Sequence, residues 1–185
     1  PKRDWSSDVC SSDLLSGNNS AEALLKPGQK VSLVVQIDKL RFGTPEETKK
    51  VLETMYRDML DSAGFELADA QPLEFKVTYS EAAGAQFQQG FGPNTGKPGV
   101  EGTKALVNLE WTNNKTESLW KHSFEYFPRT VSARGELNPE NVRNSMFEQF
   151  QRFAFGQPLP YFLSTDKKTM LSTIATIVRE YPLVA

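Results

Sequence analysis

Residues 90–99, GFGPNTGKPG, combine the glycines and the lysine of a phosphate-binding loop. Such a loop needs four residues between its two glycines and a serine or threonine directly after its lysine. Here only three residues separate Gly92 from Gly96, and Pro98 follows Lys97. Proline removes a backbone N–H donor at a point where phosphate oxygens need one. The glycine spacing is also wrong for a dinucleotide-binding turn, so we expect neither ligand at this segment.

His122 is the only histidine, and it lies among aromatic residues in the segment LWKHSFEYF. A histidine that acts as a general base needs a nucleophile and an orienting acid close by. The sequence contains no G-x-S-x-G motif and no second histidine for a metal. The carboxylates of Glu46, Glu47, Asp58 and Asp61 fall on or near one expected helix, where capping and a solvated surface explain them. We therefore predict a half-buried structural histidine, no catalytic residues, no metal site and no cofactor.

The segment 84–102 contains six of the twelve glycines and is predicted to be a long loop. Loops of this length are uncommon in compact domains unless they are functional or disordered. Phe87 and Phe91 are aromatic side chains that could anchor a partner. We expect a protein partner to bind through this loop, with Phe87 and Phe91 as binding residues, or through a sheet edge. The alternative is a hairpin loop that binds nothing.

The elements that position these residues follow from hydrophobic periodicity. Alternation of apolar and polar residues predicts strands with one buried face, and apolar residues at helical spacing predict two amphipathic helices. Thr44 and Glu47 form a capping box around Pro45, Asn138 caps the second helix, and Gly64 suits a left-handed helix end. The predicted strands cover residues 31–42, 73–79, 104–111 and 118–127, and the predicted helices cover 44–64 and 138–155.

This order of elements, β-α-β-β-β-α followed by a tail, indicates an α+β fold. Helices that are apolar on one side need a sheet to cover. We predict a two-layer sandwich, in which two helices cover one face of a mainly antiparallel four-stranded sheet. The apolar stripes of the helices, within residues 51–60 and 142–153, pack against this face. The segment PLPYFL is expected to be extended. Residues 169–179 form either a strand or a short helix, with the β-branched content favouring a strand.

Composition excludes several classes of partner. The chain of 185 residues carries 21 basic and 23 acidic residues, so no strong field attracts nucleic acid or an anionic membrane. No apolar run approaches the ~18 residues that a membrane-spanning helix needs. We expect no nucleic-acid partner and no membrane span in this sequence.

Residues 4–14, DWSSDVCSSDL, resemble the translation of a common sequencing adapter. The stretch has no apolar period, and Ser and Asp favour turns and caps over element interiors. We therefore expect residues 1–14 to be a sequencing artefact, so that Cys10 supports no redox, metal or catalytic argument and the true N-terminus, with any signal or lipid anchor, is missing. The remaining chain is predicted to comprise a linker over 15–29, a single α+β domain over 30–163 and a C-terminal tail over 164–185.

Two segments resemble small bacterial envelope lipoprotein domains, including the lipopolysaccharide-assembly type. They are TPEETKKVLETMYRDMLDSAGFELADAQPLEFKVTYSEAAG and ALVNLEWTNNKTESLWKHSFEYF, and the region from the start of the first to the end of the second covers about half the chain. The resemblance implies a non-enzymatic accessory binding or assembly domain in the bacterial periplasm or outer envelope. The alternatives are a small-ligand-binding or regulatory domain of a larger cytoplasmic protein and, third, an enzyme that uses carboxylates.

Overall fold

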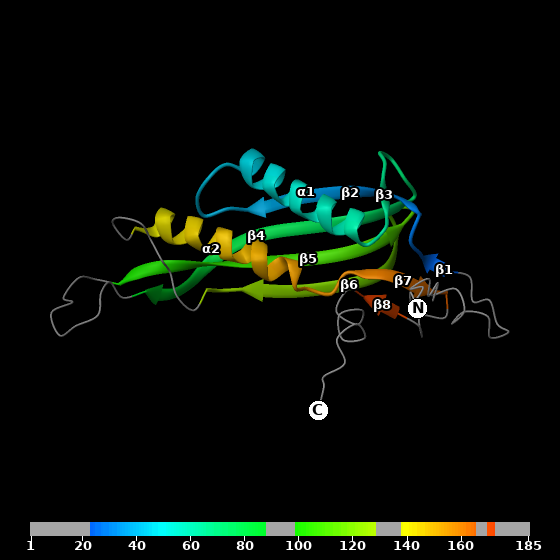
Figure 1. Cartoon of the computed structure of the whole chain (residues 1–185). Coiled ribbons are helices and arrows are strands. Elements are labelled where there is room, and N and C mark those ends of the chain that lie inside the picture. The colour runs from blue at the N-terminus through cyan, green and yellow to red at the C-terminus, as the bar shows by residue number, and fades with distance from the viewer. Residues whose placement is uncertain (1–22, 88–98, 129–137, 166–169, 173–185) are drawn as a thin grey trace, which may run out of the picture.

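The computed structural model describes residues 23–87, 99–128, 138–165 and 170–172, which form two helices and two sheets (Figure 1). The larger sheet has five strands in the order β3-β2-β4-β5-β6, and the smaller has three in the order β1-β7-β8. The elements are β1 (Ala23–Leu25), β2 (Lys30–Lys39), α1 (Pro45–Ser62), β3 (Glu66–Leu67), β4 (Leu73–Phe87), β5 (Val100–Asn113), β6 (Glu117–Tyr126), α2 (Pro139–Phe155), β7 (Pro160–Ser164) and β8 (Met170–Ser172).

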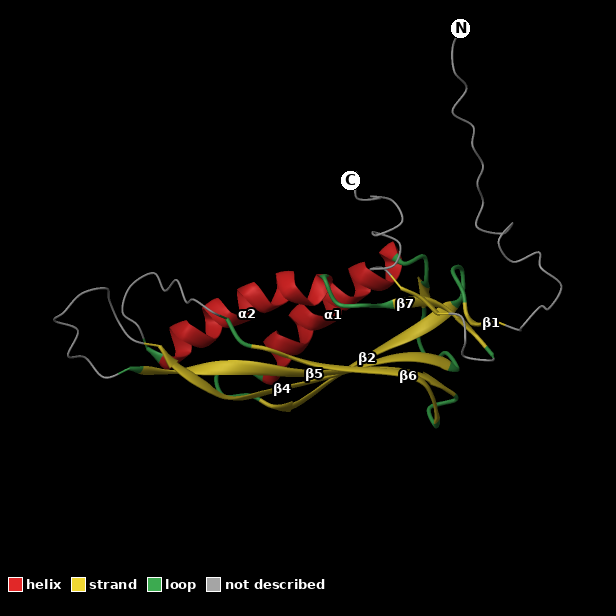
Figure 2. Ribbon diagram, turned by 90° about the horizontal axis from the view of Figure 1, so that it is seen from below, coloured by secondary structure: helices red, strands yellow, loops and turns green. Residues whose placement is uncertain are grey.

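Both helices lie on the same face of the five-stranded sheet, as Figure 2 shows. The strands alternate accordingly: in β4 every second residue from Leu73 to Glu81 is buried, and the residues between them are partly exposed. The open face of the sheet carries cross-strand ion pairs, which join Lys121 to Glu110 and Lys104 to Glu125. The predicted two-layer α+β arrangement with both helices on one face matches this structure.

The predicted four-stranded, mainly antiparallel sheet is wrong in two respects. The sheet has five strands, and it is mixed, because β2 pairs in parallel with both β3 and β4. The reason is the helix between β2 and β4. A single helical crossover returns the chain to the end of the sheet where the first strand began, so the next strand runs in the same direction. The hairpins β4-β5 and β5-β6 are antiparallel.

The smaller sheet consists of segments from both ends of the described chain. β1 lies within residues 15–29, which the sequence predicts to be a linker, and it pairs with β7. Leu25 of β1 is fully buried in the main core. The segment PLPYFL is extended as predicted and supplies most of β7. β8 occupies three residues of the predicted 169–179 element, and the rest of that element lies outside the described residues.

The helix boundaries follow the predicted caps. Thr44 Oγ1 accepts from the Glu47 backbone N–H at 3.4 Å, as an N-cap does, and donates to Glu47 Oε2 at 2.8 Å. The Glu47 carboxylate thus binds the Thr44 hydroxyl, where the predicted capping box has it bind the Thr44 backbone N–H. Asn138 caps α2 by accepting from the Asn141 N–H at 2.8 Å. Gly64 has a φ of +85°, the left-handed conformation expected just beyond α1. Among the described residues, neither helix is long and apolar enough to cross a membrane.

The long hairpin β4-β5 extends into the segment predicted as a loop. Residues 84–87 belong to β4 and residues 100–102 to β5, so the predicted loop over 84–102 is too long at both ends. The cause is the composition of this stretch, since alanine and glycine weaken a strand pattern without preventing pairing. Residues 88–98 lie outside the described residues.

An aromatic cluster fills the centre of the core between the sheet and the helices. Phe75 of β4 packs against Trp111 of β5 with ring centroids 4.8 Å apart, and Tyr56 of α1 lies 5.9 Å from Phe75. Farther along β4, Tyr79 packs against Phe150 of α2, with ring centroids 5.5 Å apart. Such tilted aromatic contacts add to the stabilisation that burial provides.

Candidate functional site

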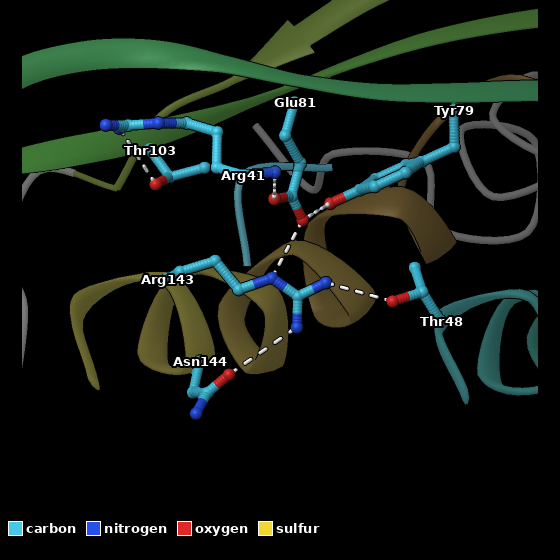
Figure 3. A network of polar contacts seen from close by, with 7 residues as sticks. All are labelled: Arg41, Thr48, Tyr79, Glu81, Thr103, Arg143 and Asn144. Atoms are coloured by element: carbon cyan, nitrogen blue, oxygen red, sulfur yellow. Dashed lines mark hydrogen bonds and ion pairs between the residues drawn. The ribbon is translucent and has the colours of Figure 1, made fainter. Parts of the chain in front are cut away.

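A network of polar and charged side chains lies near the start of both helices, and Figure 3 shows it from close by. Its centre is Glu81 of β4, whose side chain is 0% exposed. The carboxylate accepts from the Tyr79 hydroxyl at 3.0 Å, from Arg143 Nε at 2.8 Å and from the Arg41 backbone N–H at 3.0 Å. A buried carboxylate needs such donors, because leaving water without them would be very costly.

Arg143 connects α2 to β4 through this carboxylate and to α1 through a separate hydrogen bond. It projects from the start of α2, and its side chain is 7% exposed. Besides the ion pair with Glu81, its Nη2 donates to Thr48 Oγ1 of α1 at 3.0 Å, and its guanidinium lies 4.7 Å from the ring centroid of Phe147. Gly43 has a φ of +81°, and a Cβ there would lie 3.4 Å from Arg143 Nη1. The β2–α1 connection therefore passes close to the guanidinium.

Arg41 extends the network to the base of the β4-β5 hairpin. Its guanidinium donates to the backbone carbonyl of Gly102 and to Thr103 Oγ1, and it forms an ion pair with Glu101. Its own backbone N–H is bound to Glu81. One residue of the β2–α1 connection thus fixes β5 with its side chain and β4 with its backbone.

The network is suited to holding segments together and not to proton transfer. Both oxygens of Glu81 accept hydrogen bonds, and the carboxylate pairs with a guanidinium. Burial, followed by the neighbouring negative charge of Glu81, raises the pKa of Tyr79 far above its ordinary value, with Arg143 opposing. Tyr79 therefore stays a neutral donor to Glu81 at physiological pH.

The predicted binding residue Phe87 lies at the end of β4, next to this network. Its ring is partly buried and stacks on Phe127 with centroids 5.3 Å apart. Gly84 and Gly102 make room for the stack, because a Cβ on either would come within 3.0 Å of the Phe127 ring. Phe91, the other predicted binding residue, lies outside the described residues, so its role stays a prediction.

Replacing Gly102 by alanine is expected to lower the free energy of unfolding by about 1–3 kcal/mol. The new Cβ would lie 2.7 Å from the backbone carbonyl of Ala85 in β4, and a backbone atom cannot turn aside as the end of a flexible side chain can. Chemical denaturation followed by tryptophan fluorescence measures the change. Gly99→Ala is the matched control, since its Cβ would meet only contacts of 3.2 Å or more. An equal loss in both variants would contradict the close packing at the hairpin base.

His122 lies in a row of aromatic side chains on the helix-covered face of β6. Its ring stacks on Trp120 at 5.8 Å and tilts against Phe124 at 5.6 Å. Its Nε2 is 3.4 Å from Gln157 Oε1, and its side chain is half-buried. This placement agrees with the predicted structural histidine.

An open groove of about 330 Å³ lies between the two helices. Val51 and Met55 of α1 line one side and Phe155 of α2 the other, and Lys50 and Asp58 of α1 also line the groove. This volume is at the lower end of the range of small-molecule sites. Val51, predicted as part of the buried stripe of α1, faces this groove and is half-exposed.

The sequence did carry a signal for the network that our interpretation missed. Glu81 continues the alternation of β4, so it belongs on the buried face with Phe75, Val77 and Tyr79. A carboxylate at such a position requires a partner. Arg143 lies four residues before Phe147 and so on the same helix face, which makes it a candidate for that partner.

Comparison with known proteins finds no matching family model and no matching curated protein. The solved structures that match part of the chain include the following two. One is described as a homologue of neuraminyllactose-binding hemagglutinin from Helicobacter pylori, with 14% identity and a TM-score of 0.36 over 55% of this chain and 64% of the other. The second is a minor lipoprotein from Acinetobacter baumannii, with 11% identity and a TM-score of 0.38 over 68% of this chain and 88% of the other. The chain thus spans less than two thirds of the first structure, and at these TM-scores the likeness carries no argument about function.

Proposed function

We propose that this chain is a non-enzymatic accessory binding or assembly domain of the bacterial cell envelope. It binds a protein partner through the end of the sheet at which the chain passes from β4 to β5, with Phe91 among the contact residues. The envelope as its compartment rests on the resemblance of the two quoted segments to envelope lipoprotein domains.

The observation that supports a binding role most directly is the attachment of the hairpin base. Arg41 binds Gly102 and Glu101, and through Glu81 the same network reaches α1 and α2. Binding residues are commonly placed on loops that a rigid scaffold positions. A binding surface that is already fixed loses less conformational entropy when a partner binds.

The polar groups of the network support binding over chemistry. Glu81 is enclosed and already bound by three donors, so a substrate could reach it only if the core opened. The exposed carboxylates on α1 have the capping and surface roles that the sequence predicts, as the Thr44–Glu47 contact illustrates.

Photo-crosslinking from position 91 tests this proposal. The full chain carries benzophenone-alanine in place of Phe91 and, as the control, in place of Gln36, an exposed residue on the open face of β2. We expect discrete adducts from position 91 with proteins of a bacterial envelope fraction, and none from position 36. Adducts at both positions, or at neither, would contradict the proposed contact, and adducts confined to a cytoplasmic fraction would favour the regulatory-domain alternative.

A further inference from the structure

Strand β6 forms an open edge of the five-stranded sheet. Within the described part of the chain, β5 is the one strand that pairs with it. A strand of ten residues at an edge presents unpaired backbone N–H and C=O groups, which another strand can bind. Figure 1 shows β6 along the lower border of the sheet.

On the open face of the sheet, two rows of charged side chains run across the strands and end on β6. One row ends on a positive residue and the other on a negative residue. In the first row Lys76 lies opposite Glu110, and Glu110 forms an ion pair with Lys121 of β6 at 3.0 Å. Burial would raise the pKa of Glu110, but hydrogen bonds from Lys121 and Ser118 and the charges of Lys121 and Lys76 outweigh it and lower that pKa.

The second row ends on the other sign. Lys104 of β5 forms an ion pair with Glu125 of β6 at 2.8 Å. The side chains at the two ends of these rows, Lys121 and Glu125, remain 65% and 64% exposed. Each therefore has room for a further partner of opposite charge.

We propose that β6 pairs with β6 of a second copy of this chain, antiparallel, about a two-fold axis at Ser123. In this register Lys121 faces Glu125 of the second copy, and Glu125 faces Lys121. The two charge rows of each copy join into alternating rows that cross the dimer. A two-fold axis normal to the sheet also keeps the helices of both copies on one face.

Other registers of the β6–β6 pair would bring unfavourable residues opposite each other. Shifting the axis to Lys121 opposes two lysines and also Glu117 with Glu125, and like charges directly opposite are destabilising. Shifting it to His122 or Phe124 leaves Lys121 without a carboxylate opposite. Registers with the axis between two residues would set polar residues of one copy against the apolar face of the other.

The same register matches the helix-covered face of the strand. His122 meets Phe124 of the second copy, and Trp120 meets Tyr126. Cross-strand aromatic pairs of this kind stabilise antiparallel sheets. All four side chains are only half-buried in the single chain, so the dimer extends an aromatic row that otherwise stops at the edge.

Charge exchange between copies tests the proposal with the full chain. Sedimentation velocity across about 1–200 µM is expected to show a reversible dimer. Lys121→Glu and Glu125→Lys should each weaken self-association about tenfold or more, because each turns two attractive contacts into repulsive ones. An equimolar mixture of the two variants should regain the dimer, since the glutamate introduced at position 121 of one copy then faces the lysine introduced at position 125 of the other.

Lys39→Glu is the matched control, because it makes the same charge change at the end of β2, away from β6, and should leave the dimer intact. Circular dichroism confirms that each variant is folded. A wild-type chain that stays monomeric throughout the range overturns the proposal and leaves the edge to a strand of another protein. Dimerisation that Lys121→Glu does not weaken, or that the mixture does not restore, overturns it equally.

Discussion

Replacing Arg143 by methionine is expected to lower the free energy of unfolding by about 3–5 kcal/mol. The substitution removes the guanidinium and leaves the Glu81 carboxylate buried beside Tyr79 without its cation. Coulombic attraction to a buried partner is the term that offsets the desolvation of a charge, and its removal leaves that desolvation uncompensated. Urea denaturation at pH 7, followed by tryptophan fluorescence, measures the loss.

Two further variants show whether the loss of stability comes from the unpaired carboxylate of Glu81. Arg57→Met makes the same change at an exposed position in α1 and should alter stability by less than about 0.5 kcal/mol. Glu81→Leu combined with Arg143→Met removes both charges and should recover part of the loss, since apolar replacements of buried pairs are often well tolerated. A loss below about 1 kcal/mol in Arg143→Met alone would show that water reaches Glu81 and that the network is not the tie described.

Local signals determine much of this fold, and these could be read directly. The caps at Thr44 and Asn138 and the left-handed Gly64 predict the ends of the two helices to within two residues. The turn between β5 and β6 lies between the predicted strands 104–111 and 118–127, with Asn114 at a positive φ of 50°. Each of these features depends on residues that are neighbours in the chain.

Pairing between distant segments could not be read in the same way. Whether β4 runs parallel or antiparallel to β2 depends on where α1 returns the chain, and alternation along a strand does not record direction. The pairing of β1 with β7 joins residues about 140 positions apart, and a three-residue strand carries almost no periodic signal. Even so, the inward position of Glu81 was available from parity alone, because it continues the alternation of β4.

The second prediction concerns Tyr56. Removing its buried hydroxyl should leave the protein at least as stable at neutral pH as it is with the hydroxyl. Its side chain is 0% exposed, and its hydroxyl has no hydrogen-bond partner among the described residues. An unpaired buried hydroxyl costs about 1–3 kcal/mol. Tyr56→Phe is therefore expected to leave the free energy of unfolding at pH 7 unchanged or to raise it by up to about 1 kcal/mol.

The larger effect of this substitution should appear at alkaline pH. Burial raises the pKa of Tyr56 well above its ordinary value of 10.0. Above about pH 10 the unfolded chain releases this proton while the folded chain keeps it, so the unfolded state binds fewer protons and stability falls as pH rises. Each such tyrosine contributes a slope of up to about 1.4 kcal/mol per pH unit. Tyr56→Phe should remove one such slope.

Tyr79→Phe is the matched comparison, because Tyr79 is also buried with a raised pKa but donates its hydroxyl proton to Glu81. It should reduce the alkaline slope by a similar amount while lowering stability at pH 7 by about 1–3 kcal/mol, since a charged acceptor loses a donor. Denaturation curves at pH 7, 10 and 11 distinguish the two tyrosines. If both variants behaved alike at pH 7, the Tyr79–Glu81 hydrogen bond would contribute nothing to the fold, and the buried carboxylate would be stabilised by Arg143 and the Arg41 backbone N–H.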